Sequence, residues 1–190
     1  QVNDTHKINS NNFLTTSAPL ELYYCPKSKL VQLNIEVDKK ILFPKSYPYT
    51  SSTTKILRQN FSQLRKEIDK NKLLKKNDLI IDIGSNDGNL LSNFKDKYKV
   101  LGVTPENIGK IAIKKGIPTI IDYFDNDVVE KILKKYKKAK IITATNVFAH
   151  ITQVNKLVRN IKKCLRNDGV FISESHYLLS LIETNQYDTI

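Results

Sequence analysis

The chain alternates between short apolar runs and longer stretches in which apolar side chains recur at helical spacing. Apolar residues between positions 56 and 68 follow that spacing, which predicts an amphipathic helix capped by Ser52 or Thr53. From Asp78 onward the two patterns alternate. Strands are expected near residues 79–83, 100–103, 118–121, 141–144 and 169–173, and helices near 88–96, 107–115, 126–137 and 152–165. The alternation predicts an α/β fold with a parallel sheet and helices on both faces.

The segments that flank this region have other patterns. Residues 1–18 are polar and without periodicity, so we expect a mobile lead-in. Residues 20–24 and 30–35 are expected to form a hairpin joined across Cys25 to Ser28. Arg166 to Gly169 are expected to end the last helix and turn into the fifth strand, and 176–190 to form a helix or loop. We expect an appendage over 19–50 and an α/β domain over 51–190 that is truncated at its C-terminus.

One turn carries most of the chemical information. Residues 82–88 read Asp-Ile-Gly-Ser-Asn-Asp-Gly, so a buried strand enters a tight turn and then a helix, the place where α/β folds bind nucleotide-like ligands. Gly84 permits a sharp turn, and Gly88 permits a close approach that a Cβ would block. A pyrophosphate favours positive potential at a helix N-terminus, whereas Asp82 and Asp87 suit a cation. S-adenosylmethionine (SAM) carries an ammonium and a sulfonium, and the spacing resembles that of SAM-dependent methyltransferases with a Rossmann-like core.

Two further segments follow neighbouring strands. An acidic residue about 20 positions after the glycine turn usually binds the ribose hydroxyls, but Thr104 stands there. Two interpretations stay open: Glu106 or Asn107 reaches the ribose from the helix start, or Glu106 is an acid favoured by the helix dipole. After the fourth strand, Asn146 and His150 are expected where a substrate would lie.

Composition and charge narrow the class of protein. The chain has 190 residues, 40% of them hydrophobic, and no apolar stretch of the ~20 residues that a membrane span needs. Two cysteines and no signal-peptide pattern favour a cytoplasmic protein without a membrane partner. The net charge of +12 would favour anionic partners. Much of it is lysine on helix faces such as 131–138, which favours an ordinary solvated surface.

Several motifs together resemble the sugar C-methyltransferases that act on nucleotide-linked keto-deoxysugars. They run from about residue 19 to the last residue, in the family's order. They are Cys25 with Leu30-Val31-Gln32-Leu33, the loop Tyr47-Pro48-Tyr49-Thr50-Ser51-Ser52, residues 82–88, Leu101-Gly102-Val103, Lys115-Gly116-Ile117-Pro118-Thr119, residues 146–150, Asp168-Gly169-Val170 and Gln186-Tyr187-Asp188-Thr189-Ile190.

The resemblance implies a function and a set of site residues. Such enzymes deprotonate a sugar carbon beside a keto group and transfer the methyl group of SAM to the resulting enolate. The residues implied as catalytic are Tyr49 and His150, with Ser52 and Phe148 binding the substrate. The residues expected to bind the cofactor are Asp82, Gly84, Ser85, Asn86, Asp87, Gly88, Thr104 and Asn146. The family's principal acid/base run, Tyr-x-Glu-His, would begin after Ile190, so we expect this chain alone to be inactive or weakly active.

The family's N-terminal zinc module is not matched. The family has Cys-x-x-Cys where this chain reads Cys25-Pro26-Lys27-Ser28, and no earlier cysteine pair exists. A structural zinc site needs four ligands, which one cysteine with His6 does not supply. We therefore expect no metal site in this chain.

Two other functions stay open from the sequence. A nucleic-acid methyltransferase would fit the charge of +12. However, the segment after the fourth strand lacks the double proline of enzymes that methylate base amino groups, and basic residues do not cluster with aromatic ones. A non-catalytic module that binds SAM or a sugar nucleotide would fit Thr104. We expect a methyltransferase with a nucleotide-sugar substrate and no nucleic-acid partner, although fold alone does not choose among these functions.

Overall fold

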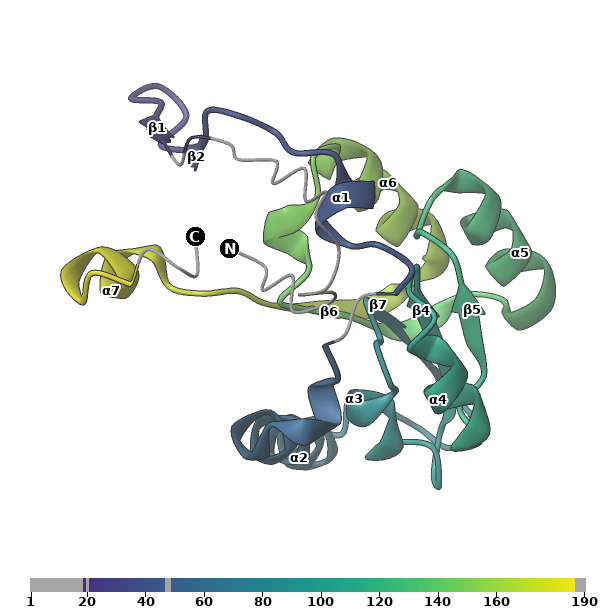
Figure 1. Ribbon diagram of the computed structural model, residues 1–190. Helices are drawn as coiled ribbons and strands as arrows, with labels where there is room; N and C mark the ends of the chain where they lie inside the picture. Colours follow the sequence, from purple (N-terminus) through teal and green to yellow (C-terminus); the bar gives the residue numbers. More distant parts are fainter. Residues whose placement is uncertain (1–18, 20, 47–48, 187–190) are drawn as a thin grey trace, which may run out of the picture. The chain divides into compact units, whose positions relative to one another are not determined.

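The structure, a computed structural model, describes residues 19, 21–46 and 49–186 (Figure 1). The chain divides into two units, residues 1–44 and 45–190. The expected lead-in over 1–18 lies outside the described residues. The division places Tyr49 and the loop that follows it in the second unit, together with the sheet.

The first unit contains a small hairpin. Strand β1 (Leu22–Tyr24) pairs antiparallel with β2 (Val31–Leu33), and a short helix α1 (Lys39–Leu42) follows. The backbone N–H of Cys25 donates to the carbonyl of Leu30, which closes the turn. The hairpin expected from the sequence is confirmed.

The second unit is built on a five-stranded parallel sheet. Its strand order is β5-β4-β3-β6-β7, and every neighbouring pair is parallel. The strands are β3 (Leu79–Ile83), β4 (Lys99–Thr104), β5 (Thr119–Ile121), β6 (Ala139–Thr145) and β7 (Leu165–Glu174). The chain adds β4 and β5 on one side of β3 and then crosses over to add β6 and β7 on the other side. The sheet therefore has a topological switch point between β3 and β6, where open α/β sheets bind ligands.

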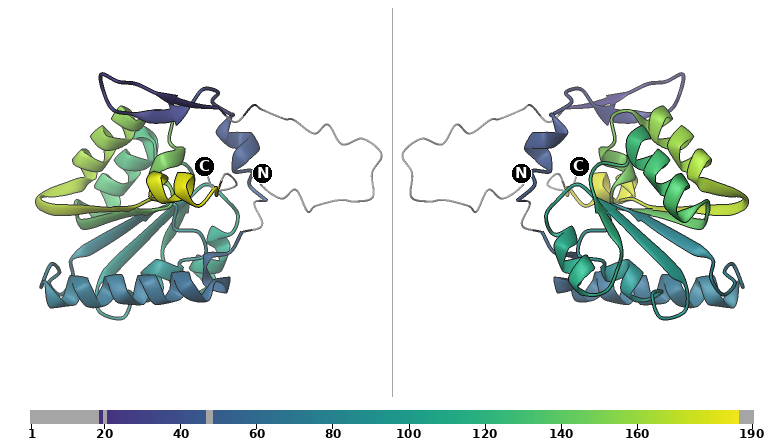
Figure 2. Two further views of the ribbon diagram at one scale, coloured as in Figure 1. Left: turned by 90° about the vertical axis from the view of Figure 1, so that its left-hand side faces the viewer. Right: turned by 90° about the vertical axis from the view of Figure 1, so that its right-hand side faces the viewer.

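Helices cover both faces of this sheet (Figure 2). Successive strand residues point to opposite faces, so Ile80 packs with α2 and α3, whereas Ile81 packs with α5 and α6. The first layer contains α2 (Lys55–Lys70), α3 (Asn89–Ser92) and α4 (Gly109–Lys114), and the second contains α5 (Asn126–Tyr136) and α6 (Val154–Cys164). Three short helical segments complete the unit: η1 (Ser51–Thr53), η2 (Phe148–His150) and α7 (Leu178–Glu183).

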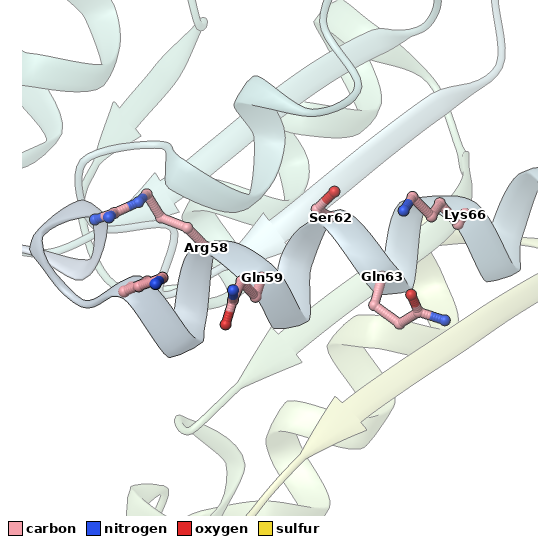
Figure 3. A pocket seen from close by; sticks show the side chains of 6 residues that line it. Arg58, Gln59, Ser62, Gln63 and Lys66 are labelled. Atoms are coloured by element: carbon pink, nitrogen blue, oxygen red, sulfur yellow. The ribbon is translucent and has the colours of Figure 1, made fainter.

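Helix α2 buries Phe61 and Ile68 against the sheet and turns a polar face to solvent. A shallow hollow on that outer face is lined by Lys55, Arg58, Gln59, Ser62, Gln63 and Lys66 (Figure 3). Its lining side chains all come from one helix, so it is part of an ordinary amphipathic surface. Among the described residues, no helix is both long enough and apolar enough to span a membrane.

The structure corrects three local expectations. Helix α2 is preceded by Thr54 rather than capped by Ser52 or Thr53, because 51–53 form a separate 3-10 turn. The helix expected over 88–96 is regular only over Asn89–Ser92. Gly169 does not end a helix, because α6 ends at Cys164 and β7 begins directly at Leu165, where it pairs with Ala139.

Candidate functional site

The turn after β3 is held by its own backbone and by close packing. Gly84 and Gly88 have left-handed φ values of 75° and 78°. A Cβ on Gly84 would lie 2.2 Å from Cγ2 of Val147, and one on Gly88 would lie 2.7 Å from Cδ1 of Ile117. The backbone N–H of Gly84 donates to the carbonyl of Val103, which ties the turn to β4. Both glycines are therefore required by the protein's own packing, before any ligand binds.

Asp82 is the last polar group of β3 before the turn, and it is almost fully buried. The hydroxyl of Thr143 on β6 donates to its Oδ1 at 2.6 Å. Burial disfavours the charged carboxylate, so the pKa of Asp82 rises to about 7, although the Thr143 hydrogen bond opposes this shift. The carboxyl group can therefore change its protonation state near neutral pH.

Asp87 is fully buried, and its carboxylate is bonded within the chain. The Ser51 hydroxyl donates to Oδ1 at 2.7 Å, and Nζ of Lys115 approaches Oδ2 at 2.9 Å. Burial alone would raise the pKa of Asp87, but the hydrogen bonds from Ser52, Ser51 and Lys115 and the lysine charge outweigh burial and lower it. The Lys115 charge also reduces the negative field that this carboxylate offers to a ligand.

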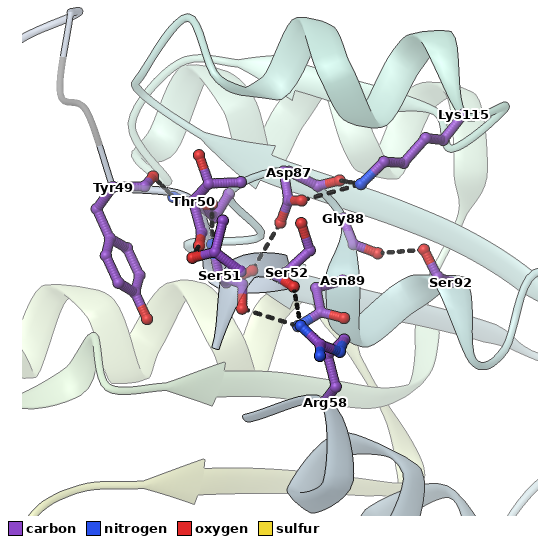
Figure 4. Close-up of polar contacts among 12 residues, drawn as sticks. Tyr49, Thr50, Ser51, Ser52, Arg58, Asp87, Gly88, Asn89, Ser92 and Lys115 are labelled. Atoms are coloured by element: carbon purple, nitrogen blue, oxygen red, sulfur yellow. Dashed lines mark hydrogen bonds and ion pairs between the residues drawn. The ribbon is translucent and has the colours of Figure 1, made fainter. Parts of the chain in front are cut away.

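The Tyr49 to Ser52 segment lies against the turn after β3, although more than thirty residues separate them in sequence (Figure 4). The Ser51 N–H donates to Oδ1 of Asn86 at 2.9 Å, and Nδ2 of Asn86 donates to the Tyr49 carbonyl at 3.0 Å. Arg58 donates to the Ser52 carbonyl from the first turns of α2. The fold thus brings the expected catalytic residue Tyr49 and the expected substrate residue Ser52 to the expected cofactor turn.

The end of β4 carries an acidic group after all. Thr104 and Glu106 are both buried, and the Thr104 hydroxyl donates to Oε2 of Glu106. Helix α4 begins only at Gly109, so Glu106 precedes its first turn and its carboxylate is directed back to the end of β4. The contact places the carboxylate of Glu106 at the end of β4, and its role stays a prediction.

Ser85 sits inside the turn between β3 and β4. Its hydroxyl lies so close to Gly102 that a Cβ there would approach the Ser85 Oγ to 2.4 Å. This Oγ is buried and has no hydrogen-bond partner among the described residues. A buried polar atom without a partner is uncommon in folded proteins.

The ends of β6 and β7 form a more open region. Asn146 has a left-handed φ of 54°, and its Nδ2 donates to Oε1 of Glu174 at 3.2 Å. His150 is exposed at the end of η2, and its pKa is lowered by desolvation from neighbouring atoms and then by the charge of His176. Phe148 is half-buried, with its ring centroid 5.9 Å from that of Phe171, so this expected substrate residue also packs against the core.

Three residues with roles at this edge were not predicted: Lys115, Glu174 and His176. The available sequence signal was position, because Glu174 ends the fifth strand and His176 follows it, as Asn146 and His150 follow the fourth. Lys115 was named only as the first residue of a family motif, and its pairing with Asp87 forms only on folding.

Neither cysteine takes part in the site contacts described above. Cys25 is exposed and free, and Cys164 is buried, which raises the pKa of its thiol to about 11. Within the described residues, no three His, Cys, Asp or Glu side chains are grouped closely enough to hold a metal ion.

Comparison with known proteins agrees with this geometry. Residues 56–189 match the methyltransferase domain family. The chain is 30% identical over 177 residues to the C-methyltransferase NovU of Streptomyces niveus, an alignment that covers 92% of this chain and 42% of that protein. The chain therefore spans less than half the length of this curated relative.

Solved structures show the same fold at low sequence identity. The plantazolicin methyltransferase BpumL, in complex with a pentazolic desmethylPZN analog and SAH, has a TM-score of 0.54 at 17% identity, covering 77% of this chain and 58% of that one. An S-adenosylmethionine-dependent methyltransferase from Clostridium acetobutylicum has a TM-score of 0.50 at 19% identity, covering 71% of this chain and 53% of that one. The Rossmann-like methyltransferase fold expected from the sequence is confirmed.

Proposed function

We propose that this chain, which belongs to the methyltransferase domain family, is the SAM-binding part of an enzyme that methylates a carbon of a nucleotide-linked keto-deoxysugar. The observation that carries the proposal is 30% identity to a C-methyltransferase over 92% of this chain. The ordered motifs of a sugar C-methyltransferase, from Cys25 to Ile190, support the choice of acceptor.

The residues present fit SAM as the cofactor. The chemistry of the donor set is suitable, since Asp82 and Glu106 bring carboxyl groups to the ends of the two neighbouring strands β3 and β4. We assign Glu106, hydrogen-bonded to Thr104, to the ribose hydroxyls, because the usual acidic residue at the end of β4 is replaced by that threonine. The turn from Gly84 to Gly88 would lie against the cofactor.

The acceptor would lie beside Tyr49, Ser52, Phe148 and His150. The hydroxyl of Tyr49 can donate a hydrogen bond to a keto or hydroxyl oxygen of a sugar, and the hydroxyl of Ser52, which donates to Asp87, can accept one from a sugar hydroxyl. Because its pKa lies below the ordinary value, His150 is neutral at neutral pH and can accept a hydrogen bond or a proton from the acceptor.

The chemistry assigns different tasks to the bound groups and to the protein. When bound, SAM supplies a methyl group on a positively charged sulfur. If His150 accepts the proton from the carbon beside the keto group, that carbon becomes the nucleophilic end of an enolate. It would take the methyl group, and the electron pair of the broken carbon–sulfur bond would stay on the sulfur of the demethylated product. This chain's residues would hold the two partners in line, and such alignment accounts for much of enzymatic acceleration.

The proposal is tested in two stages. Calorimetric titration should show binding of S-adenosylhomocysteine (SAH), the demethylated product of SAM, with no comparable heat from NAD. Protein extended beyond Ile190 should then transfer a carbon-13 methyl group from SAM to a nucleotide-linked keto-deoxysugar, and NMR should assign the label to a carbon. A label on oxygen or nitrogen, or transfer to RNA instead, would contradict the assigned acceptor.

A further inference from the structure

We infer that Asn86 is a positioning residue that joins the cofactor turn, residues 84–88, to the acceptor loop, residues 49–52, so that one segment of chain places both reaction partners. The identities of the two ligands rest on the proposed function. The connection between the turn and the loop rests on contacts alone.

Both polar atoms of the Asn86 side-chain amide bond to the acceptor loop. Its Oδ1 accepts the Ser51 N–H at 2.9 Å, and its Nδ2 donates to the Tyr49 carbonyl at 3.0 Å. The amide thus pairs with the loop backbone as a neighbouring strand would. Asn86 has a left-handed φ of 50°, a conformation that asparagine tolerates better than most residues. Because the Asn86 side chain is directed to the loop, any contact of Asn86 with the cofactor is made by its backbone.

Two neighbours of Asn86 reinforce the connection. The Ser51 hydroxyl donates to Asp87 at 2.7 Å, and Nδ2 of Asn89 donates to the Ser51 carbonyl at 3.2 Å. The N–H, hydroxyl and carbonyl of Ser51 are thus all bonded to residues in or next to the cofactor turn. Ser51 is only 8% exposed, so these bonds are shielded from water. Lys115 holds the second oxygen of Asp87 and fixes the carboxylate in place.

The connection has a functional consequence. A misplacement of about 1 Å between reacting groups can cost on the order of 10²-fold in rate, so the acceptor loop must be in register with the cofactor. A ligand that orders the cofactor turn will also order the loop through Asn86. Because linkage is reciprocal, a ligand on the loop will strengthen cofactor binding by the same factor.

A glycine substitution isolates the amide of Asn86. Asn86→Gly removes both hydrogen bonds while keeping a residue that adopts the left-handed backbone. Asn77→Gly is the matched control, because Asn77 also has a positive φ of 70° and is exposed at the opposite end of β3. In hydrogen exchange without ligand, the Ser51 amide should exchange about 10- to 100-fold faster in Asn86→Gly, as expected for two lost hydrogen bonds, and unchanged in Asn77→Gly. Retained protection in β3 and β6 shows that the fold is intact.

Adding SAH tests the coupling itself. In the parent chain and in Asn77→Gly, SAH should slow exchange at Ser51, whereas in Asn86→Gly it should bind without that slowing. Equal slowing in Asn86→Gly would overturn the inference, as would loss of SAH binding in a folded Asn86→Gly, which would make the side chain a cofactor contact. Absence of SAH binding by the parent chain would overturn the proposed function and the coupling together. Unchanged Ser51 exchange in ligand-free Asn86→Gly would overturn the connection alone.

Discussion

The two halves of the sheet's carboxyl edge are built differently. In the cofactor half, at the ends of β3 and β4, Asp82, Asp87 and Glu106 are buried and bonded within the chain. In the acceptor half, at the ends of β6 and β7, Asn146 and His150 are exposed. The cofactor half is therefore shaped by the same interactions that stabilise the fold, so substitutions there should change stability and binding together. In the acceptor half, a substitution should be able to change binding without changing stability.

The largest effect is expected from Gly88→Ala in the cofactor half. The new Cβ would meet Ile117 at 2.7 Å and Ala112 at 3.0 Å, and φ at this position is 78°. Backbone strain and overpacking together should lower the free energy of unfolding by about 2 to 5 kcal/mol. Urea denaturation measures the loss, and SAH titration should show weaker binding in the same variant.

Gly116→Ala separates the two causes. Gly116 also has a positive φ, 76°, but nothing lies within 4 Å of its Cβ position. Its cost should be strain alone, about 1 to 2 kcal/mol, with SAH affinity unchanged. Equal losses for the two variants would show that packing around the cofactor turn does not contribute.

A second effect is expected from Asp82→Asn, and it depends on pH. Burial raises the pKa of Asp82 from 3.8 to about 7, so the folded state keeps a proton that the unfolded state loses. The unfolded state binds fewer protons between these values, and the parent chain therefore loses stability as pH rises from about 4 to about 7. Asparagine cannot ionise, so the variant should lack this loss.

The stability of Asp82→Asn relative to the parent should accordingly increase by about 3 to 4 kcal/mol across that range. Urea midpoints at about pH 4, 6 and 8 measure it. SAH binding should weaken even where the variant is more stable, because a carboxyl group of the cofactor half is lost. A constant difference between the two proteins at every pH would contradict the raised pKa.

The fold was largely readable from the sequence, for reasons visible in single elements. The sequence predicted β3 with its observed bounds because four of its five residues are apolar. All five are buried in the structure. Strand β7 was expected to begin at 169 but begins at Leu165, since Arg166 to Asp168 are polar and carry no apolar pattern. Arg166 pairs with Asp168 in the same segment and with Asp78 just before β3, and Lys140 on β6 pairs with Asp168.

For the site, the sequence predicted only which positions lie at the carboxyl edge of the sheet, and not which side chains contact one another. The glycine turn and the segment after β6 were found because strand ends meet at one edge of a parallel sheet. Sequence spacing did not show that Lys115 would pair with Asp87, or that Thr104 would donate to Glu106. These contacts depend on how helices pack and how side chains turn, which a one-dimensional pattern does not contain. The sequence correctly placed two acidic residues at the turn. It did not show that Lys115 pairs with the charge of Asp87 or that burial raises the pKa of Asp82.

A smaller effect is expected from Glu106→Gln, which tests the acidic group of the cofactor half. If its carboxylate accepts hydrogen bonds from the ribose, the neutral amide should weaken SAH binding about tenfold, the usual value of one hydrogen bond to a charged group. Glu130→Gln on exposed α5 is the control and should not change the affinity. An unchanged affinity in Glu106→Gln would assign the ribose to another residue.

The smallest effect is expected in the acceptor half, from His176→Ala. The pKa of His150 is lowered first by desolvation and then by the charge of His176, so removing that charge should move the pKa of His150 back toward its ordinary value without restoring it fully. Because both side chains are exposed, the free energy of unfolding should change by no more than about 0.5 kcal/mol. NMR titration of the His150 ring measures the pKa, and SAH affinity should be the same in both proteins. A large loss of stability, or of SAH affinity, would show that the acceptor half is coupled to folding as tightly as the cofactor half.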